Sequence, residues 1–366
     1  MRSEPVPEAI RRGVPPHFFI DEQWLGAQSE DVIEPELPII DAHHHIWSRA
    51  APYLVPELVG DLACGHNLRG TVYVEAGFAW REEGDPRFAS VGEVEYANGV
   101  GALFASGHHG AVRACAGIVG RVDLTLGSFA GKVMRDCLAR APDRFRGVRH
   151  MVACDPDPAV SRLPKPPPPD LLLDKRFRAG FAELAPLGLS FDAYCYHPQL
   201  AQLIDLADAF PDTRIVVDHI GAPLGEGSYA SRRDDVFRHW RADITALARR
   251  PNVLVKLGGL CGRIAGFPFI DRDTPPRSEE LAAAWRPYLE TCIEAFGAQR
   301  SMFESNFPPD KAGCSARVLW NAFKRVAAHC SATERAQLFA GTAQRAYRLP
   351  ASLLPITSPR QQETTS

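Results

Sequence analysis

PIIDAHHH, residues 38–45, is a short apolar run that ends in three consecutive histidines. An apolar run of this length is typical of a strand in a buried parallel sheet. His43 and His45 are two positions apart, so on a strand their side chains point to one face, whereas His44 points to the other. Two imidazoles on one face can bind one Zn²⁺, Fe²⁺ or Mn²⁺ ion. The segment therefore predicts a buried strand and the beginning of a metal site.

Seven further apolar runs of similar length follow along the chain. They are residues 71–77, 114–123, 147–155, 189–197, 214–221, 252–260 and 300–308. Amphipathic stretches typical of helices separate most of them, for example residues 124–140, 198–210 and 278–296, and another, residues 333–347, follows the last run. Strands that alternate eight times with helices predict an α/β fold, a single (β/α)₈ TIM barrel over residues 37–350. An open doubly wound sheet is the alternative, but no GxGxxG or GxxxxGK[ST] motif follows any of the runs.

The two ends of the chain lack this pattern. Residues 1–36 are rich in Pro, Glu and Arg, and they predict an arm that lies on the barrel or on a neighbouring subunit of a homo-oligomer. Residues 351–366 are polar and predict a disordered tail. The run PKPPPP, residues 164–169, predicts a stiff loop because proline lacks a backbone donor.

The composition of the 366 residues is that of an ordinary globular protein, with 45% hydrophobic and 23% charged residues. A net charge of -3 gives no electrostatic reason to expect nucleic acid or an anionic membrane as a partner. The nine cysteines are scattered and include no CxxC pair, which indicates reduced thiols. No signal peptide or 18-residue apolar run is present. We therefore expect a cytoplasmic enzyme that acts on a small molecule.

Polar side chains gather at the predicted strand ends, where a (β/α)₈ barrel builds its active site. They are Glu75, Arg149, His150, Tyr196, His197, Asp218, His219, Lys256, Glu304, Asn306 and Asp310. We expect His197 and His219 to bind the same metal as the first-strand histidines. His150 either joins them or orients the substrate. Glu75 either bridges two metal ions or holds a ligand histidine in place.

Other residues near these ends are candidates for contacting the substrate. Arg149 and Lys256 either meet a substrate anion or form a salt bridge at the barrel rim. Tyr53, Tyr194 and Tyr196, together with Trp47 and Arg149, suggest an organic molecule with an apolar body and an acidic group. No GxSxG motif and no recognisable Cys/His pair is present, which disfavours serine and cysteine nucleophiles.

Several segments resemble the amidohydrolase superfamily, in particular the amidohydrolase-related branch that includes sugar-lactone and muconolactone hydrolases. The matching segments are IIDAHHHIW, GHNLRGTVYVEAG, CAGIVGRVDLTLG, FRGVRH, LGLSFDAYCYHPQL, PDTRIVVDHIG, PNVLVKLGGL, MFESNFPPDK, LWNAFKR and GTAQRAYRL, which together span residues 38–349. The resemblance implies a (β/α)₈ barrel with one or two divalent metals at its mouth. It also implies hydrolysis by a metal-bound hydroxide.

Carried over residue by residue, the family's HxH corresponds to His43 and His45, and its fifth- and sixth-strand histidines to His197 and His219. The fourth strand has no lysine, so the carbamylated-lysine bridge of some members is absent and Glu75 is the available substitute. The family's eighth-strand aspartate, which binds metal and moves a proton, falls at Asn306. An asparagine can coordinate through its carbonyl oxygen but cannot accept a proton at neutral pH.

Two main hypotheses follow from this departure. In the first, the metal activates water to hydrolyse a lactone, ester or amide, and Asp310 or a histidine such as His150 moves the proton. In the second, the same histidines with His150, Glu75 and Asn306 hold two irons, or iron and manganese. Such a centre activates O₂ against a C–H bond, as in a few monooxygenases that resemble this branch. A third hypothesis is a catalytically inactive barrel that serves as a partner subunit. Hydrolysis is the prediction we adopt.

Overall fold

Eight strands form one parallel sheet in sequence order in the computed structural model, which describes residues 20–48, 52–160 and 166–354. The strands are β1 (Ile39–His44), β2 (Leu68–Val74), β3 (Arg113–Arg121), β4 (Phe145–Arg149), β5 (Ser190–Ala193), β6 (Ile215–Val217), β7 (Val253–Leu257) and β8 (Ser301–Phe303). The ring closes just beyond β8, where His44 and Phe307 form a parallel bridge. The backbone N–H of His45 donates to the carbonyl of Phe307 at 2.7 Å. The predicted TIM barrel is confirmed.

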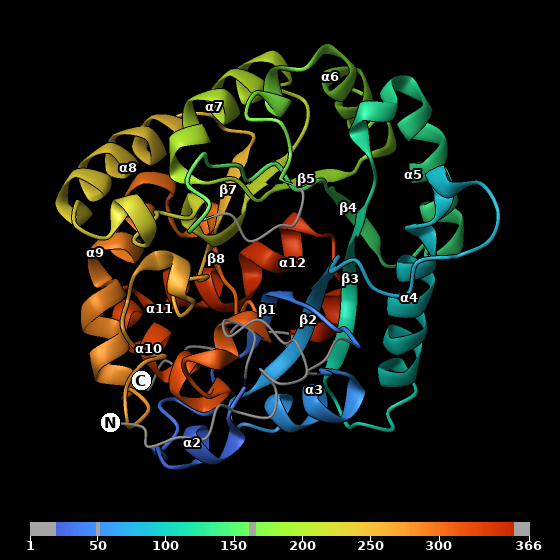
Figure 1. The fold of residues 1–366 in the computed structure, drawn as a ribbon. Helices are drawn as coiled ribbons and strands as arrows, with labels where there is room; N and C mark the ends of the chain where they lie inside the picture. The colour runs from blue at the N-terminus through green and yellow to red at the C-terminus, as the bar shows by residue number, and fades with distance from the viewer. Residues whose placement is uncertain (1–19, 49–51, 161–165, 355–366) are drawn as a thin grey trace, which may run out of the picture.

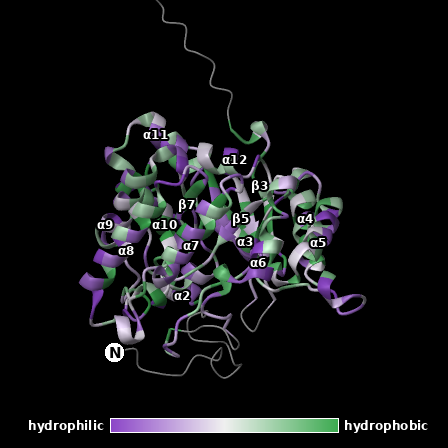
Figure 2. Cartoon of the chain, turned by 90° about the horizontal axis from the view of Figure 1, so that it is seen from above, coloured by the Kyte–Doolittle hydropathy of each residue, from purple (hydrophilic) through white to green (hydrophobic). Residues whose placement is uncertain are grey.

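A ring of helices surrounds the strands (Figure 1). These helices are α3 (Val55–Leu62), α4 (Val91–Ala105), α5 (Ala130–Arg140), α6 (Lys175–Phe181), α7 (Leu200–Ala209), α8 (Arg233–Leu247), α9 (Ser278–Phe296) and α10 (Ala316–Val326). In α9, Leu281, Trp285 and Leu289 recur every four residues and are all buried. Hydrophilic residues alternate with hydrophobic ones along α8 and α9 (Figure 2). The burial of one helix face against the sheet follows from this periodicity.

The helix expected over residues 124–140 is divided in the structure. A 3-10 segment covers Leu124–Phe129 and α5 begins only at Ala130. Gly127 lies within the first segment with φ 64° and ψ -142°, a conformation that is outside the helical region and open mainly to glycine. The glycine therefore stops the helical pattern from continuing into the preceding loop.

The C-terminal segment closes the end of the barrel opposite the site. The stretch predicted as one helix forms α11 (Ala332–Ala336), a π-helical turn (Gln337–Gly341) and α12 (Thr342–Ala346). Side chains from this segment pack against the inward-facing residues of the strands; the combined cluster includes Ile40, Val72, Val119, Met302, Ala343, Tyr347, Leu349 and Leu353. Ala351–Leu353 form a 3-10 turn, and residues 355–366 of the predicted tail lie outside the described residues.

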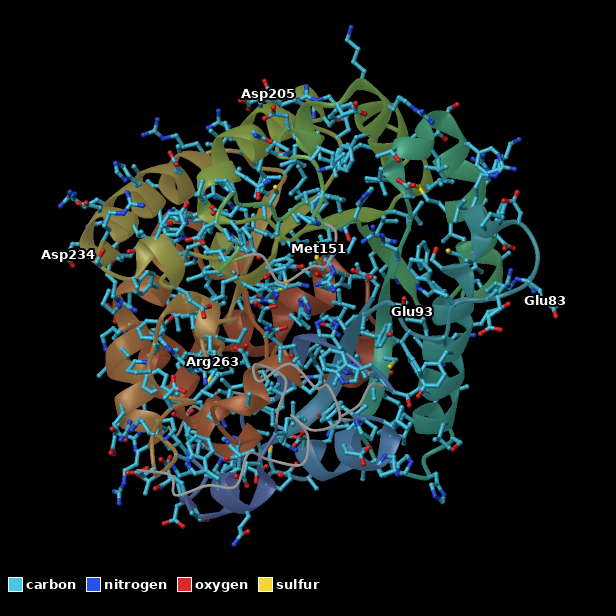
Figure 3. The ribbon with its side chains drawn as sticks, viewed as in Figure 1. Glu83, Glu93, Met151, Asp205, Asp234 and Arg263 are labelled. Atoms are coloured by element: carbon cyan, nitrogen blue, oxygen red, sulfur yellow. The ribbon has the colours of Figure 1, made fainter. Side chains whose placement is uncertain are left out.

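Asp205 and Asp234 lie on the outside of the helix ring, whereas Met151 lies over its centre (Figure 3). All nine cysteines are unpaired, as their spacing predicts. In the ranges that the structure describes, no helix has both the length and the apolar character needed to cross a membrane.

The described part of the predicted arm lies against α10. It contains the short helix α2 (Glu22–Gly26), and residues 1–19 lie outside the described residues. The buried side chain of Asn321 accepts from the backbone N–H of Ile33 at 2.9 Å and donates to Glu30 and to the carbonyl of Asp31. Lys324 donates to the carbonyls of Ile33 and Glu34, both at 2.8 Å. These bonds fix the arm to the barrel wall.

We expect Asn321→Ala to lower the free energy of unfolding by about 2 kcal/mol, because it leaves a backbone N–H without its acceptor in a buried setting. Urea denaturation followed by circular dichroism measures the change. The control is Gln28→Ala in the same arm, whose side chain makes one exposed hydrogen bond and whose loss costs less than about 0.5 kcal/mol. Equal stability of the two variants would show that the arm contributes nothing through Asn321.

Candidate metal centre

The two alternate histidines of β1 converge in the structure. The Nε2 atoms of His43 and His45 lie 3.1 Å apart, and both side chains are buried. The Nδ1–H of His45 donates to the carbonyl of Val74 at 2.8 Å, which leaves the lone pair on Nε2. Burial lowers the pKa of both imidazoles, so both are neutral. The spacing read from the sequence therefore produces two neutral nitrogen donors that face each other.

His219 approaches the same point from the end of β6. The chain turns there through a left-handed conformation, with φ 55° at His219. A Cβ at Gly259 would lie 2.4 Å from the Cβ of His219, so the glycine after β7 makes room for this turn. The ring centroids of His43 and His219 are 4.8 Å apart. His219 thus depends on a glycine from a neighbouring strand for its position.

The carboxylate of Glu304, just past β8, orients two of these rings. Its Oε1 accepts from Nδ1 of His219 at 2.7 Å, and its Oε2 lies 3.1 Å from Nδ1 of His43. Burial alone would raise the pKa of Glu304, but the two histidines hold it at about 2. An ionised carboxylate beside Nδ1 keeps the ring proton on that nitrogen, so the lone pair on Nε2 is free to bind a metal ion. Metal-binding histidines usually have such a carboxylate partner.

The geometry of these donors fits a divalent metal ion. Two imidazole nitrogens on one ion at about 2.0–2.1 Å, at an angle of about 90–110°, lie roughly 2.9–3.4 Å apart. The observed separation of His43 and His45 is 3.1 Å. A second grouping places one possible ligand atom each from His43, His219 and Glu304 within 4.8 Å of one another, and Glu304 contacts both rings on their Nδ1 side. Two imidazole nitrogens 3.1 Å apart either share one N–H in a hydrogen bond or, with both lone pairs turned inward, hold a cation between them.

The charge around the histidines also fits one divalent ion. Four buried carboxylates and two buried cations lie there: Glu75, Asp192, Asp218, Glu304, Arg149 and Lys256. Burial alone would lower the pKa of Lys256, but Asp192 at 2.7 Å and Asp218 at 2.9 Å outweigh it and raise the pKa. With the buried Asp41 and Asp310 nearby, the carboxylates outnumber the cations, which favours a bound cation at the histidines.

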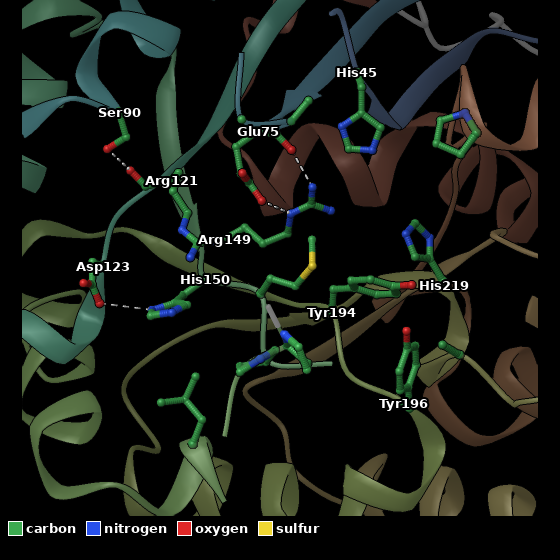
Figure 4. Close-up of a pocket in the computed structure, with 18 of the residues that line it drawn as sticks. His45, Glu75, Ser90, Arg121, Asp123, Arg149, His150, Tyr194, Tyr196 and His219 are labelled. Atoms are coloured by element: carbon green, nitrogen blue, oxygen red, sulfur yellow. Dashed lines mark hydrogen bonds and ion pairs between the residues drawn. The ribbon is translucent and has the colours of Figure 1, made fainter. Parts of the chain in front are cut away.

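Arg149 occupies the position beside the histidines and pairs with Glu75. Its Nε donates to Oε1 of Glu75 at 2.8 Å, and its Nη1 lies 3.4 Å from Nε2 of His43 and 3.5 Å from Asp218 (Figure 4). The Arg149 guanidinium lies close to His43 and binds Glu75, so the Glu75 carboxylate is already paired with a cation. The arrangement favours one ion over a pair bridged by Glu75.

Asp310 does reach back to Asn306, across the intervening prolines. The Nδ2 of Asn306 donates to Oδ1 of Asp310 at 3.0 Å, and the backbone N–H of Cys261 donates to Oδ2 at 3.1 Å. Burial raises the pKa of Asp310 to about 7, although His219 and these two donors act in the opposite direction. Both side chains line the cavity at the mouth of the barrel. A carboxylate therefore stands beside the position where the family's aspartate is missing.

His197 does not join the other histidines. β5 ends at Ala193, and His197 begins a 3-10 turn four residues later. Its Nδ1 accepts from the backbone N–H of Leu224 at 3.3 Å, and its ring packs against Tyr229. Tyr194, nearer the strand end, lines the cavity instead, with its ring 5.2 Å from that of His219. The long apolar run 189–197 concealed the early end of the strand.

Of the residues predicted to contact the substrate, some line the cavity and others do not. Arg149, His150 and Tyr196 line the cavity. Tyr53 is buried away from it and donates its hydroxyl to Asp61 at 2.6 Å. Lys256 is fully buried beneath His43, with Nζ 3.1 Å from Nδ1, so it meets carboxylates and not a substrate.

The cavity has a volume of about 1160 Å³, large enough for a substrate bigger than a simple sugar lactone. Two of its lining residues, Trp80 and Arg121, were not among the sequence candidates. Arg121 ends β3, so its place at a strand end was the available signal. Trp80 lies in the loop after β2, where no sequence pattern pointed to it.

The comparison with known proteins settles the family. Residues 40–349 match the sequence model of the amidohydrolase family. The chain belongs to this family. The match confirms the resemblance seen in the sequence and covers the whole barrel.

Three proteins illustrate what this amidohydrolase is similar to. The uncharacterized protein y4mH of Sinorhizobium fredii is 31% identical over 86% of this chain and 99% of its own length. An L-fucono-1,5-lactonase of Burkholderia multivorans is 29% identical over 57% of this chain and 64% of its own. A crystal structure of a Burkholderia multivorans amidohydrolase with bound zinc has a TM-score of 0.63 and 25% identity, and it covers 85% of this chain and 99% of the other.

We expect the full chain to bind one Co²⁺ per molecule and His45→Ala to weaken this binding by more than about 100-fold, beyond the range of outer-shell changes. Cobalt absorption and calorimetric titration of metal-stripped protein measure both quantities. The matched control is His197→Ala, which keeps the wild-type affinity because its ring lies away from the centre. A stoichiometry of two, or equal losses in both variants, would contradict the geometry.

Proposed function

We propose that the chain hydrolyses a lactone or ester of a small organic acid by means of one divalent metal ion. The observation that carries the proposal is the position of Asp310, a carboxylate that lines the same cavity as His45 and His219. A divalent ion, whether zinc, iron or manganese, would supply the Lewis acidity that polarises a carbonyl and acidifies water. The residues of the chain then bind the ion and move the proton.

Asp310 is the residue that we assign to proton transfer. Asn306 holds its Oδ1 and the backbone of Cys261 holds its Oδ2, so the carboxylate is fixed in one orientation. Such a fixed carboxylate can accept the proton of an attacking water and return it to the leaving alkoxide. Position 306 holds asparagine where the family has aspartate, but the same loop supplies a carboxylate, that of Asp310, which acts as the base.

Two further observations support hydrolysis over oxygenation. The diiron alternative needs Glu75 to bridge two ions, and this carboxylate accepts from Arg149 at 2.8 Å. Both the lactonase and the zinc-bound amidohydrolase described above are similar to this chain. A zinc-type centre that opens lactones agrees with both relatives.

We expect Asp310→Asn to lower kcat/KM for lactone opening by about 10²- to 10⁴-fold while the bound metal remains, because only the proton acceptor is lost. A pH indicator follows acid release from a panel that includes L-fucono-1,5-lactone, and metal analysis follows the ion.

The matched control is the double variant Asn306→Asp, Asp310→Asn, which exchanges the two side chains. It retains the hydrogen-bonded pair and recovers part of the activity. An Asp310→Asn enzyme with the wild-type rate would remove Asp310 from the mechanism. Oxygen uptake by an iron-loaded chain that opens none of the lactones would favour the oxygenase.

A further inference from the structure

Two arginines lie side by side at the ends of β3 and β4. Arg121 and Arg149 are paired in register across these parallel strands. Side chains in register on neighbouring strands point to the same face of a sheet, and both of these line the cavity. Like charges in neighbouring positions destabilise a sheet. The pair is therefore costly for the fold, which points to a role in the cavity.

Within the described part of the chain, only one of these two arginine charges is neutralised by a carboxylate. Arg149 pairs with Glu75 and lies near Asp218. For Arg121, the residues that the structure describes provide no carboxylate within ion-pair distance and no acceptor for its guanidinium. Asp123, two residues further on, uses Oδ1 to accept from Thr125 N at 2.9 Å and Oγ1 at 2.6 Å. Figure 4 shows the guanidinium of Arg121 between Arg149 and His150.

The other arginines of the cavity differ from Arg121 in this respect. Arg87 pairs with Asp85, and Arg263 pairs with Asp271. Among the described lining residues, Arg121 is thus the arginine whose charge no side chain balances. An uncompensated guanidinium at the wall of a cavity is suited to an anionic ligand.

His150 supplies a second donor beside it. The backbone N–H of Leu124 donates to Nδ1 of His150 at 3.1 Å, so the ring carries its proton on Nε2. Burial lowers the pKa of His150 to about 3, and the charge of Arg121 acts in the same direction, so the ring is neutral. One cation and one neutral N–H donor, with the carboxylate of Asp123 3.9 Å from Nδ1 of His150, match a group with no more than a single negative charge. This chemistry fits a carboxylate better than a phosphate dianion.

The surroundings of this pair are largely apolar. Trp80 is 45% exposed, lines the cavity, and is held by a bond from its indole N–H to the buried Glu93 at 3.0 Å. Leu126, Met151 and Leu171 line the same cavity. A ligand with its charge at Arg121 would therefore place an apolar body against these side chains.

We propose that Arg121 and His150 bind a carboxylate of the substrate at a distance from the bond that is cleaved. Figure 4 places this pair across the cavity from His45 and His219. The substrate class is then a lactone or ester with an apolar body and a free carboxylate. The cleavage part of this statement rests on the proposed function, whereas carboxylate binding at Arg121 does not.

The experiment is calorimetric titration of the full metal-loaded chain with phenylalkanoates of one to four methylenes and with their neutral amides. We expect at least one acid to bind about 10- to 100-fold more tightly than its amide, the effect of a charge-assisted hydrogen bond. Arg121→Met abolishes the preference and leaves amide binding unchanged. Arg121→Lys retains part of it, because a lysine keeps the charge but not the planar fork.

The matched control is Arg87→Met, which removes an arginine that lines the same cavity but is paired with Asp85. It leaves the preference intact. A preference that survives in Arg121→Met with its thermal unfolding unchanged would place the carboxylate elsewhere and overturn the proposal. The absence of a preference throughout the series in the wild-type chain would also overturn it.

The metal-deficient variant His45→Ala separates this proposal from the proposed function. If Arg121 binds the carboxylate, the preference for the acid persists in this variant. If the metal ion binds the carboxylate, the preference is lost. If the chain opens no lactone but still prefers the acid over its amide, the carboxylate subsite is supported and only the proposed hydrolase function is contradicted.

Discussion

The approach of two imidazole nitrogens to 3.1 Å, inside a barrel end with an excess of carboxylates, is the constraint on which the site depends. Neutral imidazoles repel at this distance when both present lone pairs, and a buried excess of negative charge is unfavourable without a counter-ion. A divalent ion relieves both conditions at once. The strand end therefore fits a divalent cation.

The rest of the barrel mouth is arranged around this requirement. Glu304 holds His43 and His219 by their Nδ1 sides, so it fixes which nitrogen faces the centre. Lys256 neutralises the carboxylates beneath the histidines, and Arg149 neutralises Glu75 beside them. Arg121, next to Arg149, is left with its charge directed at the cavity. The inner charges thus surround the candidate metal centre, and the charge of Arg121 faces the cavity.

The sequence was sufficient for the fold and for the first-strand histidines. Eight alternations of strand and helix and the spacing of two between His43 and His45 are local patterns that the barrel preserves. His197 was placed with them because the apolar run 189–197 does not reveal that β5 stops at Ala193. Whether Glu75 faces a metal or an arginine depends on Arg149, 74 positions along the chain, which no local pattern reports.

Glu304 and Asn306 illustrate the same limit within one strand end. They are two positions apart beyond the end of β8, where Asn306 has φ 50°, and the family pattern drew attention to Asn306. The carboxylate that contacts the histidines is Glu304, and the one that Asn306 holds is Asp310. Backbone closure between β8 and β1 decides these contacts, and it is a property of the whole ring.

The most direct test of the central claim is a crystal structure of the zinc-loaded chain with anomalous scattering at the zinc edge. The account predicts one strong peak within bonding distance of Nε2 of His43, His45 and His219. Two peaks bridged by Glu75, or a peak bound to His197 and not to the β1 pair, would contradict it.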